Sequence, residues 1–289
     1  MKKLFTLGVL LVLGVTALGS SQGQAFNSGT HIYIAERVFP FALDKINLNY
    51  GSIAPDLAMY VPDGADWTLE EAFMDTHYDY IDLPYAWWSL SQRAFAKGWQ
   101  THNEFWGADF YAHGRYPTYD GYVITQAIRL ASIFPSLYDP PNFELAHFAI
   151  EVAIDLLLVR YQEPGLGLKL LGAAKYRSQG DLDLMAKALV WDNNPDRATL
   201  SAAESNFRDL VINYATALAL PDPLRMYAIG ELGSQIAQSM GANIDPVDVR
   251  WILRVAMYLC QNPNDMGIDY MEVIQAGIEG IRTNPYLMK

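Results

Sequence analysis

Helical periodicity is the sequence feature that most constrains how this chain can fold. Apolar residues recur with the spacing of a helix face along most of its length, whereas the strict alternation typical of strands is scarce. The periodic segments are residues 30–41, 86–113, 121–135, 143–161, 181–191, 197–219, 222–240, 246–261 and 269–283. The sequence therefore predicts an all-α fold.

The segments between these helices predict loops rather than domain boundaries. Residues 42–67 and 76–86 are rich in Pro, Gly, Asp and Tyr and are expected to form ordered loops. We find no internal repeat, and no linker clearly divides the chain. Hydrophobic residues make up 51% of the chain and charged residues 18%, so a substantial core can be buried. We expect one multi-helix domain over residues 26–289.

The N-terminal residues have the parts of a secretory signal peptide. Two lysines precede an apolar stretch over residues 4–18, and small and polar residues follow it. The stretch is short for a membrane span, which needs about 20 apolar residues; an uncleaved N-terminal anchor is the alternative. Residues 23–25, Gly-Gln-Ala, form a small-x-small cleavage site. We expect residues 1–25 to be removed. The mature chain would then begin at Phe26, have no transmembrane helix, and be exported to a periplasm or secreted.

The net charge argues against tight binding of nucleic acid. The formal charge is −12, and it becomes −14 without Lys2 and Lys3, because residues 1–25 contain no Asp or Glu. A chain this acidic does not hold nucleic acid by phosphate neutralisation alone. It would need local cations, and bound metal ions are one source.

His147 and Glu151 form the clearest chemical motif. They lie four residues apart in a strongly helical run, so they share one face. Their neighbours are nearly all apolar, so the helix is expected to be buried almost all round. A buried carboxylate needs compensation, which a metal ion supplies; a buried His–Glu hydrogen bond is the alternative. Asp155, one turn further on, is expected to accept a hydrogen bond from a metal ligand.

A second group consists of His102, Asp109 and His113. Asp109 and His113 are four residues apart, and His102 precedes Asp109 by seven. All three can face the same side if residues 86–113 form one helix. Glu104 lies near this face but points differently, and it is a weaker candidate. Facing helices with inward carboxylates and histidines are how helical bundles build multinuclear metal sites.

The remaining histidines, His31 and His77, complete a marked asymmetry. All five histidines lie between residues 31 and 147, and residues 165–289 contain none. Asp56 belongs to the same part of the chain, and Pro55 restricts the backbone before it. Histidines and carboxylates gathered in this way favour a joint explanation, which is a metal site.

These residues resemble, in order, the pattern of the zinc-dependent phospholipase C and S1/P1 nuclease superfamily. That pattern is an N-terminal aromatic residue, an early His, an Asp, a His, a His-Asp-His group and a final His-x-x-x-Glu. The resemblance spans Phe26 to Glu151, about half of the mature chain, and uses every histidine. In the family, the amine and carbonyl of the first mature residue bind zinc. In the nuclease branch the ligand His follows five residues later, which is the spacing of Phe26 and His31.

The resemblance implies an all-helical domain of the phospholipase C/P1 nuclease type with three Zn²⁺ ions. One would be held by the Phe26 terminus, His31 and Asp109. The second would be held by Asp56, His77, His102 and Asp109, with Asp109 bridging, and the third by His113, His147 and Glu151. Three protein ligands leave a position on zinc for water or substrate. Six residues separate His102 from Asp109 where the family has three, so an extra turn or bulge is expected there.

The function that this resemblance implies is hydrolysis of phosphate esters. Asp56 is expected to be catalytic, orienting or deprotonating the attacking water. The His-x-x-x-Glu ending and the loop before Asp56 look more like the phospholipase C branch, so the expected substrate is a phospholipid or another phosphodiester. Transient contact with a membrane surface would follow. Leu57 stands where choline-binding members have an aromatic residue, which argues against choline specificity.

Two other functions stay open at this point. One is an S1/P1-type nuclease that acts on single-stranded nucleic acid or 3′-nucleotides, with nucleic acid as substrate only. The other is a non-catalytic helical binding protein that keeps zinc for stability. An open coordination position with a cavity above it would favour an enzyme, whereas a closed cluster would favour the structural role.

Overall fold

The structure, a computed structural model, describes residues 27–83, 89–114, 121–138, 142–190, 195–263 and 267–288. These residues form an all-helical fold. Its α-helices are α1 (Ser28–Val38), α2 (Lys45–Ile53), α3 (Leu69–Met74), α4 (Leu90–Gln100), α5 (Ala108–Ala112), α6 (Gly121–Ile133), α7 (Asn142–Tyr161), α8 (Leu166–Tyr176), α9 (Gln179–Leu189), α10 (Arg197–Leu218), α11 (Leu224–Ser239), α12 (Pro246–Gln261) and α13 (Tyr270–Thr283). Three short helices of other types are η1 (Ala54–Tyr60), η2 (Asp75–Asp79) and η3 (Pro135–Leu137).

The all-α prediction is confirmed, and most of the predicted helices lie where the periodicity places them. Two expectations were wrong. Residues 42–67 are not a loop, because they contain α2 and η1. The predicted loop at 76–86 overlaps η2, a single turn of π-helix. The sequence of α2 contains Asn, Gly and Ser, which have low helix propensity, but burial of residues 47–53 against neighbouring helices compensates.

The predicted single helix over residues 86–113 is also wrong. The chain leaves α4 after Gln100 and becomes helical again only at Ala108, and residues 86–88 lie outside the described part. Asn103 interrupts the helix, because its side chain competes for backbone N–H groups that a continuous helix would use. His102, Asp109 and His113 therefore do not share one helix face, although the fold still brings them near one another.

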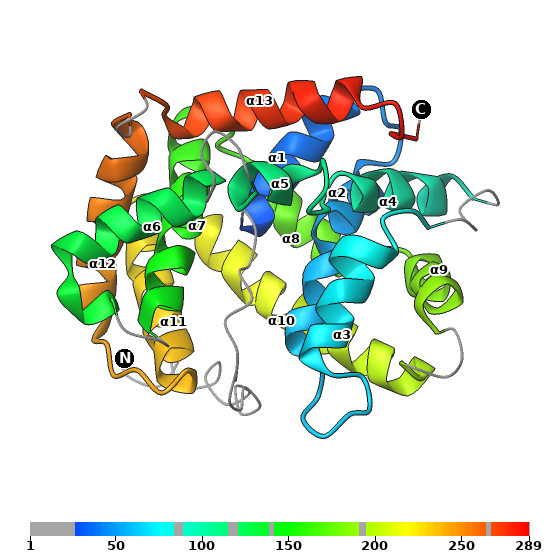
Figure 1. Ribbon diagram of the computed structural model, residues 1–289, viewed down its shortest axis with the longest axis horizontal. Helices are drawn as coiled ribbons and strands as arrows, with labels where there is room; N and C mark the ends of the chain where they lie inside the picture. The colour runs from blue at the N-terminus through cyan, green and yellow to red at the C-terminus, as the bar shows by residue number, and fades with distance from the viewer. Residues whose placement is uncertain are drawn as a thin grey trace, which may run out of the picture.

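The helices lie in two groups, and α13, which packs on α1 and α5, runs across both. In Figure 1, α6, α7, α11 and α12 lie on the left, and α2, α3, α4 and α9 on the right, with α13 running above both. Helix α1 packs on α2 in one group and on α7 in the other, and also on α8. Helix α10 packs on α8, on η1 and on α11. Most buried apolar side chains form one hydrophobic cluster with members from α1 to α13, and Ala35, Leu48 and Ala94 form a small second one.

Helices α2 and α4 approach each other closely at a glycine. A Cβ on Gly98 would collide with the Leu48 carbonyl of α2, so only glycine permits this contact. Helix η1 directly follows α2, so this close contact places η1 near the turn that follows α4. Both of these segments supply residues to the site described below. Within the described part of the chain, no helix is long and apolar enough to cross a membrane.

Asp155 anchors the first turn of α1 to the middle of the fold. It lies on α7 and is fully buried. Its carboxylate accepts hydrogen bonds from the Gly29 N–H (3.0 Å), the Thr30 hydroxyl (2.7 Å) and the Tyr214 hydroxyl of α10 (2.9 Å). A carboxylate at the start of a helix also complements the helix dipole. The sequence placed Asp155 beside a metal ligand. The structure instead gives it these three partners, which belong to α1 and α10.

Replacing Asp155 by Ala should strongly destabilise the protein. The change leaves three buried donors without an acceptor, which we expect to lower the free energy of unfolding by about 3 kcal/mol. Urea denaturation followed by circular dichroism measures this. Asp209→Ala, at an exposed position on α10, is the control and should change stability by less than about 0.5 kcal/mol. Equal effects of the two substitutions would show that Asp155 does not anchor α1.

Candidate metal centre

The histidines and carboxylates singled out in the sequence converge from six separate segments. His31 lies on α1, Asp56 on η1, His77 on η2, and His102 in the turn after α4. Asp109 lies in the first turn of α5 and His113 is its C-cap residue. His147 and Glu151 lie on α7. The expected ligand Phe26 lies outside the described residues. All the other expected ligands are brought together in three groups that could each hold a metal ion: His31, His102 and Asp109; Asp56, His77 and His102; and His113, His147 and Glu151.

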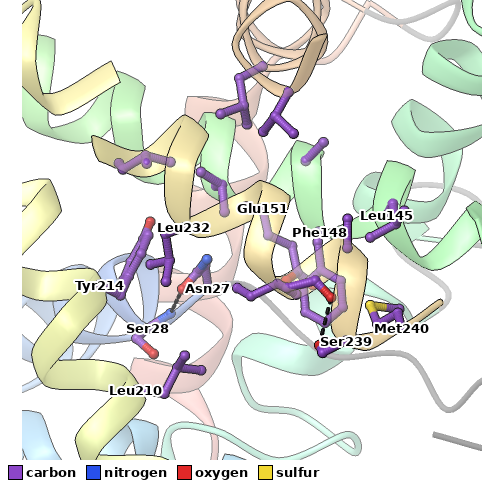
Figure 2. Close-up of a pocket in the computed structure, with 18 of the residues that line it drawn as sticks. Asn27, Ser28, Leu145, Phe148, Glu151, Leu210, Tyr214, Leu232, Ser239 and Met240 are labelled. Atoms are coloured by element: carbon purple, nitrogen blue, oxygen red, sulfur yellow. Dashed lines mark hydrogen bonds between the residues drawn. The ribbon is translucent and has the colours of Figure 1, made fainter. Parts of the chain in front are cut away.

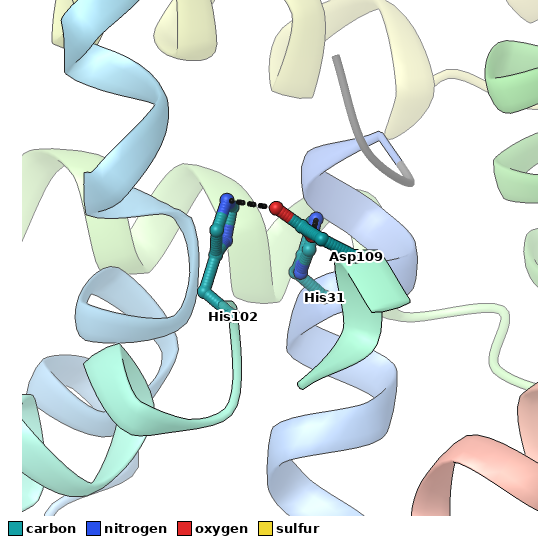
Figure 3. A group of neighbouring side chains, drawn as sticks. All are labelled: His31, His102 and Asp109. Atoms are coloured by element: carbon teal, nitrogen blue, oxygen red, sulfur yellow. Dashed lines mark ion pairs between the residues drawn. The ribbon is translucent and has the colours of Figure 1, made fainter. Parts of the chain in front are cut away.

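Asp109 connects the first two groups. One of its oxygens lies 3.4 Å from His31 Nε2, and the other lies 3.1 Å from His102 Nε2. His77 Nε2 approaches the second oxygen to 3.6 Å. In Figure 3 the Asp109 carboxylate points at His102 with His31 close beside it. Each oxygen of this one buried carboxylate thus faces a different set of imidazoles.

Asp56 is a second carboxylate that approaches His77 and His102. Its Oδ1 is 3.3 Å from His102 Nε2 and 3.8 Å from His77 Nε2. An ion with tetrahedral bonds of about 2.0–2.1 Å to N and O ligands places those ligands roughly 3.3 Å apart. The separations around His102 are close to that value. The side chain of Asp56 is 13% exposed, whereas those of His102 and Asp109 are fully buried, so Asp56 is the member that reaches toward solvent.

The third group combines α5 and α7. His147 Nε2 lies 2.9 Å from Glu151 Oε1 and 2.7 Å from His113 Nε2. His113 Nε2 is 3.7 Å from the same Glu151 oxygen. The helical pair His147 and Glu151 therefore faces one site, as its spacing indicated, and His113 approaches from the facing segment.

Outer hydrogen bonds orient these rings. His102 Nδ1 is 2.8 Å from the Ser52 carbonyl, which can only accept, so Nδ1 carries a proton and Nε2, which faces Asp109 and Asp56, is the nitrogen that a metal ion would take. His77 Nδ1 is 2.8 Å from the Thr76 hydroxyl. In the third group, Glu104 lies 3.6 Å from His113 Nδ1 and Glu144 lies 3.5 Å from His147 Nδ1. Metal-binding histidines commonly have such partners on their second nitrogen.

Sequence reasoning missed most of these outer partners. Glu104 was a weak candidate as a ligand, and the structure places it behind His113 instead. Glu144 precedes His147 by three residues, a helical spacing that could have indicated the contact. The Ser52 carbonyl carried no sequence signal, because a backbone acceptor is available at any position. Thr76 stands next to His77 in sequence, but adjacency alone does not indicate a hydrogen bond.

The turn between α4 and α5 places His102 next to Asp109. The Asn103 side chain accepts hydrogen bonds from the N–H groups of Phe105, Trp106 and Gly107. The Asp109 N–H donates to the His102 carbonyl at 3.0 Å, which closes the loop. A Cβ on Gly107 would lie 2.5 Å from that carbonyl, so the closure requires glycine. The six residues between His102 and Asp109 thus form a closed loop.

Unsatisfied buried atoms provide a test of whether these residues fit a metal. Both ring nitrogens of His31, both carboxylate oxygens of Asp109 and Glu151 Oε1 have no hydrogen-bond partner among the described residues. Buried polar groups without partners are rare in native proteins and call for an explanation such as a bound ion. The donors are imidazole nitrogens and carboxylate oxygens, the ligands that zinc and related divalent ions accept. The residues therefore fit a metal ion.

Without a metal, protons have to balance the buried carboxylates. Burial alone would lower the pKa of His113, but Glu104 and Glu151 outweigh it and raise this pKa to about 10. Burial likewise opposes the charged form of His102, while Asp109 and Asp56 raise its pKa well above the usual range. Burial would raise the pKa of Asp56, yet the nearby His102 and His77 hold it far below normal. Asp56 is therefore ionised at neutral pH.

Comparison with known proteins provides no further assignment. Family models, curated proteins and solved structures all give no match to this chain. The site is therefore defined by the geometry and chemistry of its own residues.

Replacing Asn103 by Ala should loosen the metal site without touching a ligand. Three backbone N–H groups lose their acceptor, and His102 is no longer held beside Asp109. We expect affinity for a divalent metal, measured by competition with a chromophoric chelator, to fall by at least about tenfold. Asn103→Asp keeps the acceptor oxygen and should retain most of the affinity. Unchanged affinity in Asn103→Ala would contradict this role of the loop.

Metal binding should release protons. Since nearby carboxylates raise the pKa of His102 well above its usual range and that of His113 to about 10, these two rings carry protons at pH 7 in the metal-free protein and must lose them to coordinate. Affinity should therefore rise with pH across the neutral range. Calorimetric titrations with metal in buffers of different ionisation enthalpy measure the number of protons released. An absence of proton release would contradict the assignment of these histidines as metal ligands.

The raised pKa of His113 also makes the stability of the metal-free protein depend on pH. The stability contributed by protonated His113 is fully present below pH 6.5 and is lost as pH rises toward 10.

Proposed function

We propose that this protein is an exported zinc-dependent phosphoric ester hydrolase of the phospholipase C type. The observation that carries the proposal is the pair of groups joined by the buried Asp109 carboxylate, with unsatisfied nitrogen and oxygen atoms turned inward. Two neighbouring metal ions are a recurrent arrangement in enzymes that hydrolyse phosphate esters. The net charge of −12 favours a substrate other than a long nucleic acid, which would be repelled by the rest of the surface.

Zinc at these residues would supply Lewis acidity and a water of lowered pKa. The chain supplies the rest. Asp109 would hold His31 and His102 at fixed separation, and the Ser52 carbonyl would keep His102 in the tautomer that presents Nε2. Asp56, ionised and partly exposed, would accept a hydrogen bond from the attacking water and orient it. Its strongly lowered pKa makes it a poor proton acceptor, so orienting the water is the role that its chemistry favours.

The cavity beside the cluster favours an enzyme over a purely structural metal site. Asp56 and Glu151, which belong to different groups of the cluster, both line the same cavity. A structural zinc site is closed by protein ligands, whereas a catalytic one keeps an open position. A route for a small molecule to these carboxylates is what hydrolysis needs.

The proposal is tested with the zinc-loaded protein and a panel of phosphate esters. We expect hydrolysis of a phospholipid and of small phosphodiesters, with slower or no hydrolysis of single-stranded DNA and 3′-nucleotides. Faster hydrolysis of nucleic acid would instead identify a nuclease. Failure to hydrolyse any of these substrates with zinc bound would leave a zinc-stabilised binding protein.

Asp56→Asn should separate catalysis from metal binding. The amide cannot carry the charge that orients water, so we expect kcat to fall by about 10²–10⁴-fold. Zinc content should fall much less, because His77, His102 and Asp109 remain. Steady-state kinetics and metal analysis on the same sample give both numbers. Parallel loss of zinc and activity would make Asp56 a structural ligand only.

A further inference from the structure

A cavity of about 190 Å³ lies between α7, α10, α11 and α12. Figure 2 shows Leu145, Phe148 and Glu151 among the side chains that line it, with Leu232 and Tyr214 toward the left of the view and Ser239 and Met240 below Phe148. Three of the four helices, α10 to α12, come from the part of the chain that contains no histidine. Most of the lining side chains are apolar, among them Phe148, Val152, Leu210, Leu232, Ile236 and Ile252.

The cavity has a polar end and an apolar body. Asn27, Ser28, Asp56 and Glu151 line it where it meets the metal centre. Beside that end, the Tyr214 hydroxyl donates to Asp155 at 2.9 Å, and further along the cavity the Ser239 hydroxyl donates to the Ile236 carbonyl at 2.7 Å. These hydroxyl protons are already committed. A nucleobase or sugar entering the apolar body would lose hydrogen bonds to water without replacement, which is unfavourable, whereas a hydrocarbon chain would lose none.

The size of the cavity suits part of an alkyl chain. An apolar cavity of about 150 Å³ lined by Leu, Ile and Phe is enough to bind benzene. Phe148, Val152, Leu210, Leu232 and Ile236 each remain partly accessible here, so they have apolar surface still to bury. Burial of such surface against a hydrocarbon is favourable in proportion to its area.

We propose that this cavity is the subsite for the hydrocarbon chain of an amphiphilic phosphodiester whose phosphate lies at the metal centre. The inference rests on the proposed function and adds to it the place where the hydrocarbon chain of the substrate binds. In this proposal, helices α10 to α12, from the part of the chain without histidine, form the apolar wall of the substrate site. Asp56 and Glu151 mark the boundary between the phosphate and the chain.

The test uses the zinc-loaded full chain and a series of 4-nitrophenyl alkyl phosphates from methyl to octyl. Each methylene that enters the cavity should raise kcat/KM by roughly fourfold until the cavity is filled. Leu232→Trp and Ile236→Trp fill the cavity and should lower the octyl-to-methyl ratio of kcat/KM at least tenfold. Gln238→Trp, at an exposed position of the same helix, is the matched control and should keep the ratio of the unmodified protein. Equal rates along the series would overturn the inference and leave the proposed function standing.

A binding measurement covers the case in which no ester is hydrolysed. Calorimetric titration of the unmodified protein with octyl phosphate and with methyl phosphate compares the two ligands directly. Much tighter binding of octyl phosphate, weakened in Ile236→Trp and kept in Gln238→Trp, would support a chain-binding cavity even though the proposed function had failed. Equal binding of the two phosphates would overturn the inference.

Discussion

The arrangement of the site depends on one buried charge, the carboxylate of Asp109. It is fully buried and neither oxygen has a hydrogen-bond donor among the described residues, yet three histidines from three segments turn toward it. An isolated carboxylate in such a place is very costly, and burial raises its pKa to about 6. A cation between Asp109 and the imidazoles removes that cost. Much of the surrounding structure can be understood as the means of holding these groups close together.

The supports of the site come from outside the ligand set. The Asn103 loop and Gly107 bring the start of α5 back against His102, and the Gly98 contact between α2 and α4 brings η1 and its Asp56 to the same place. Asp155 fixes the first turn of α1 through Gly29 and Thr30, the two residues directly before His31. Asn103, Gly107, Gly98 and Asp155 do not belong to the three groups of expected ligands. They set the separations between ligands, and a shift of one ångström would spoil the coordination of a small ion.

Helical periodicity was sufficient to predict the fold class and most helix positions, because apolar faces of long helices leave a clear pattern. It failed where burial or a side-chain hydrogen bond overrides local preference, as in α2 and at Asn103. The expected ligands converge in the structure, apart from Phe26, which lies outside the described residues. The Ser52 carbonyl and the cavity between α7 and α10–α12 depend on tertiary contacts, so no local pattern could indicate them.

The central claim is that the three groups of ligands bind metal, and metal content tests it most directly. The protein would be expressed with its own N-terminal segment, purified without chelators, and examined by metal mass spectrometry together with its N-terminal residue. The account predicts close to three zinc ions per chain, one for each group, on a chain that begins at Phe26. Little or no zinc on a chain that begins at Phe26 would contradict it.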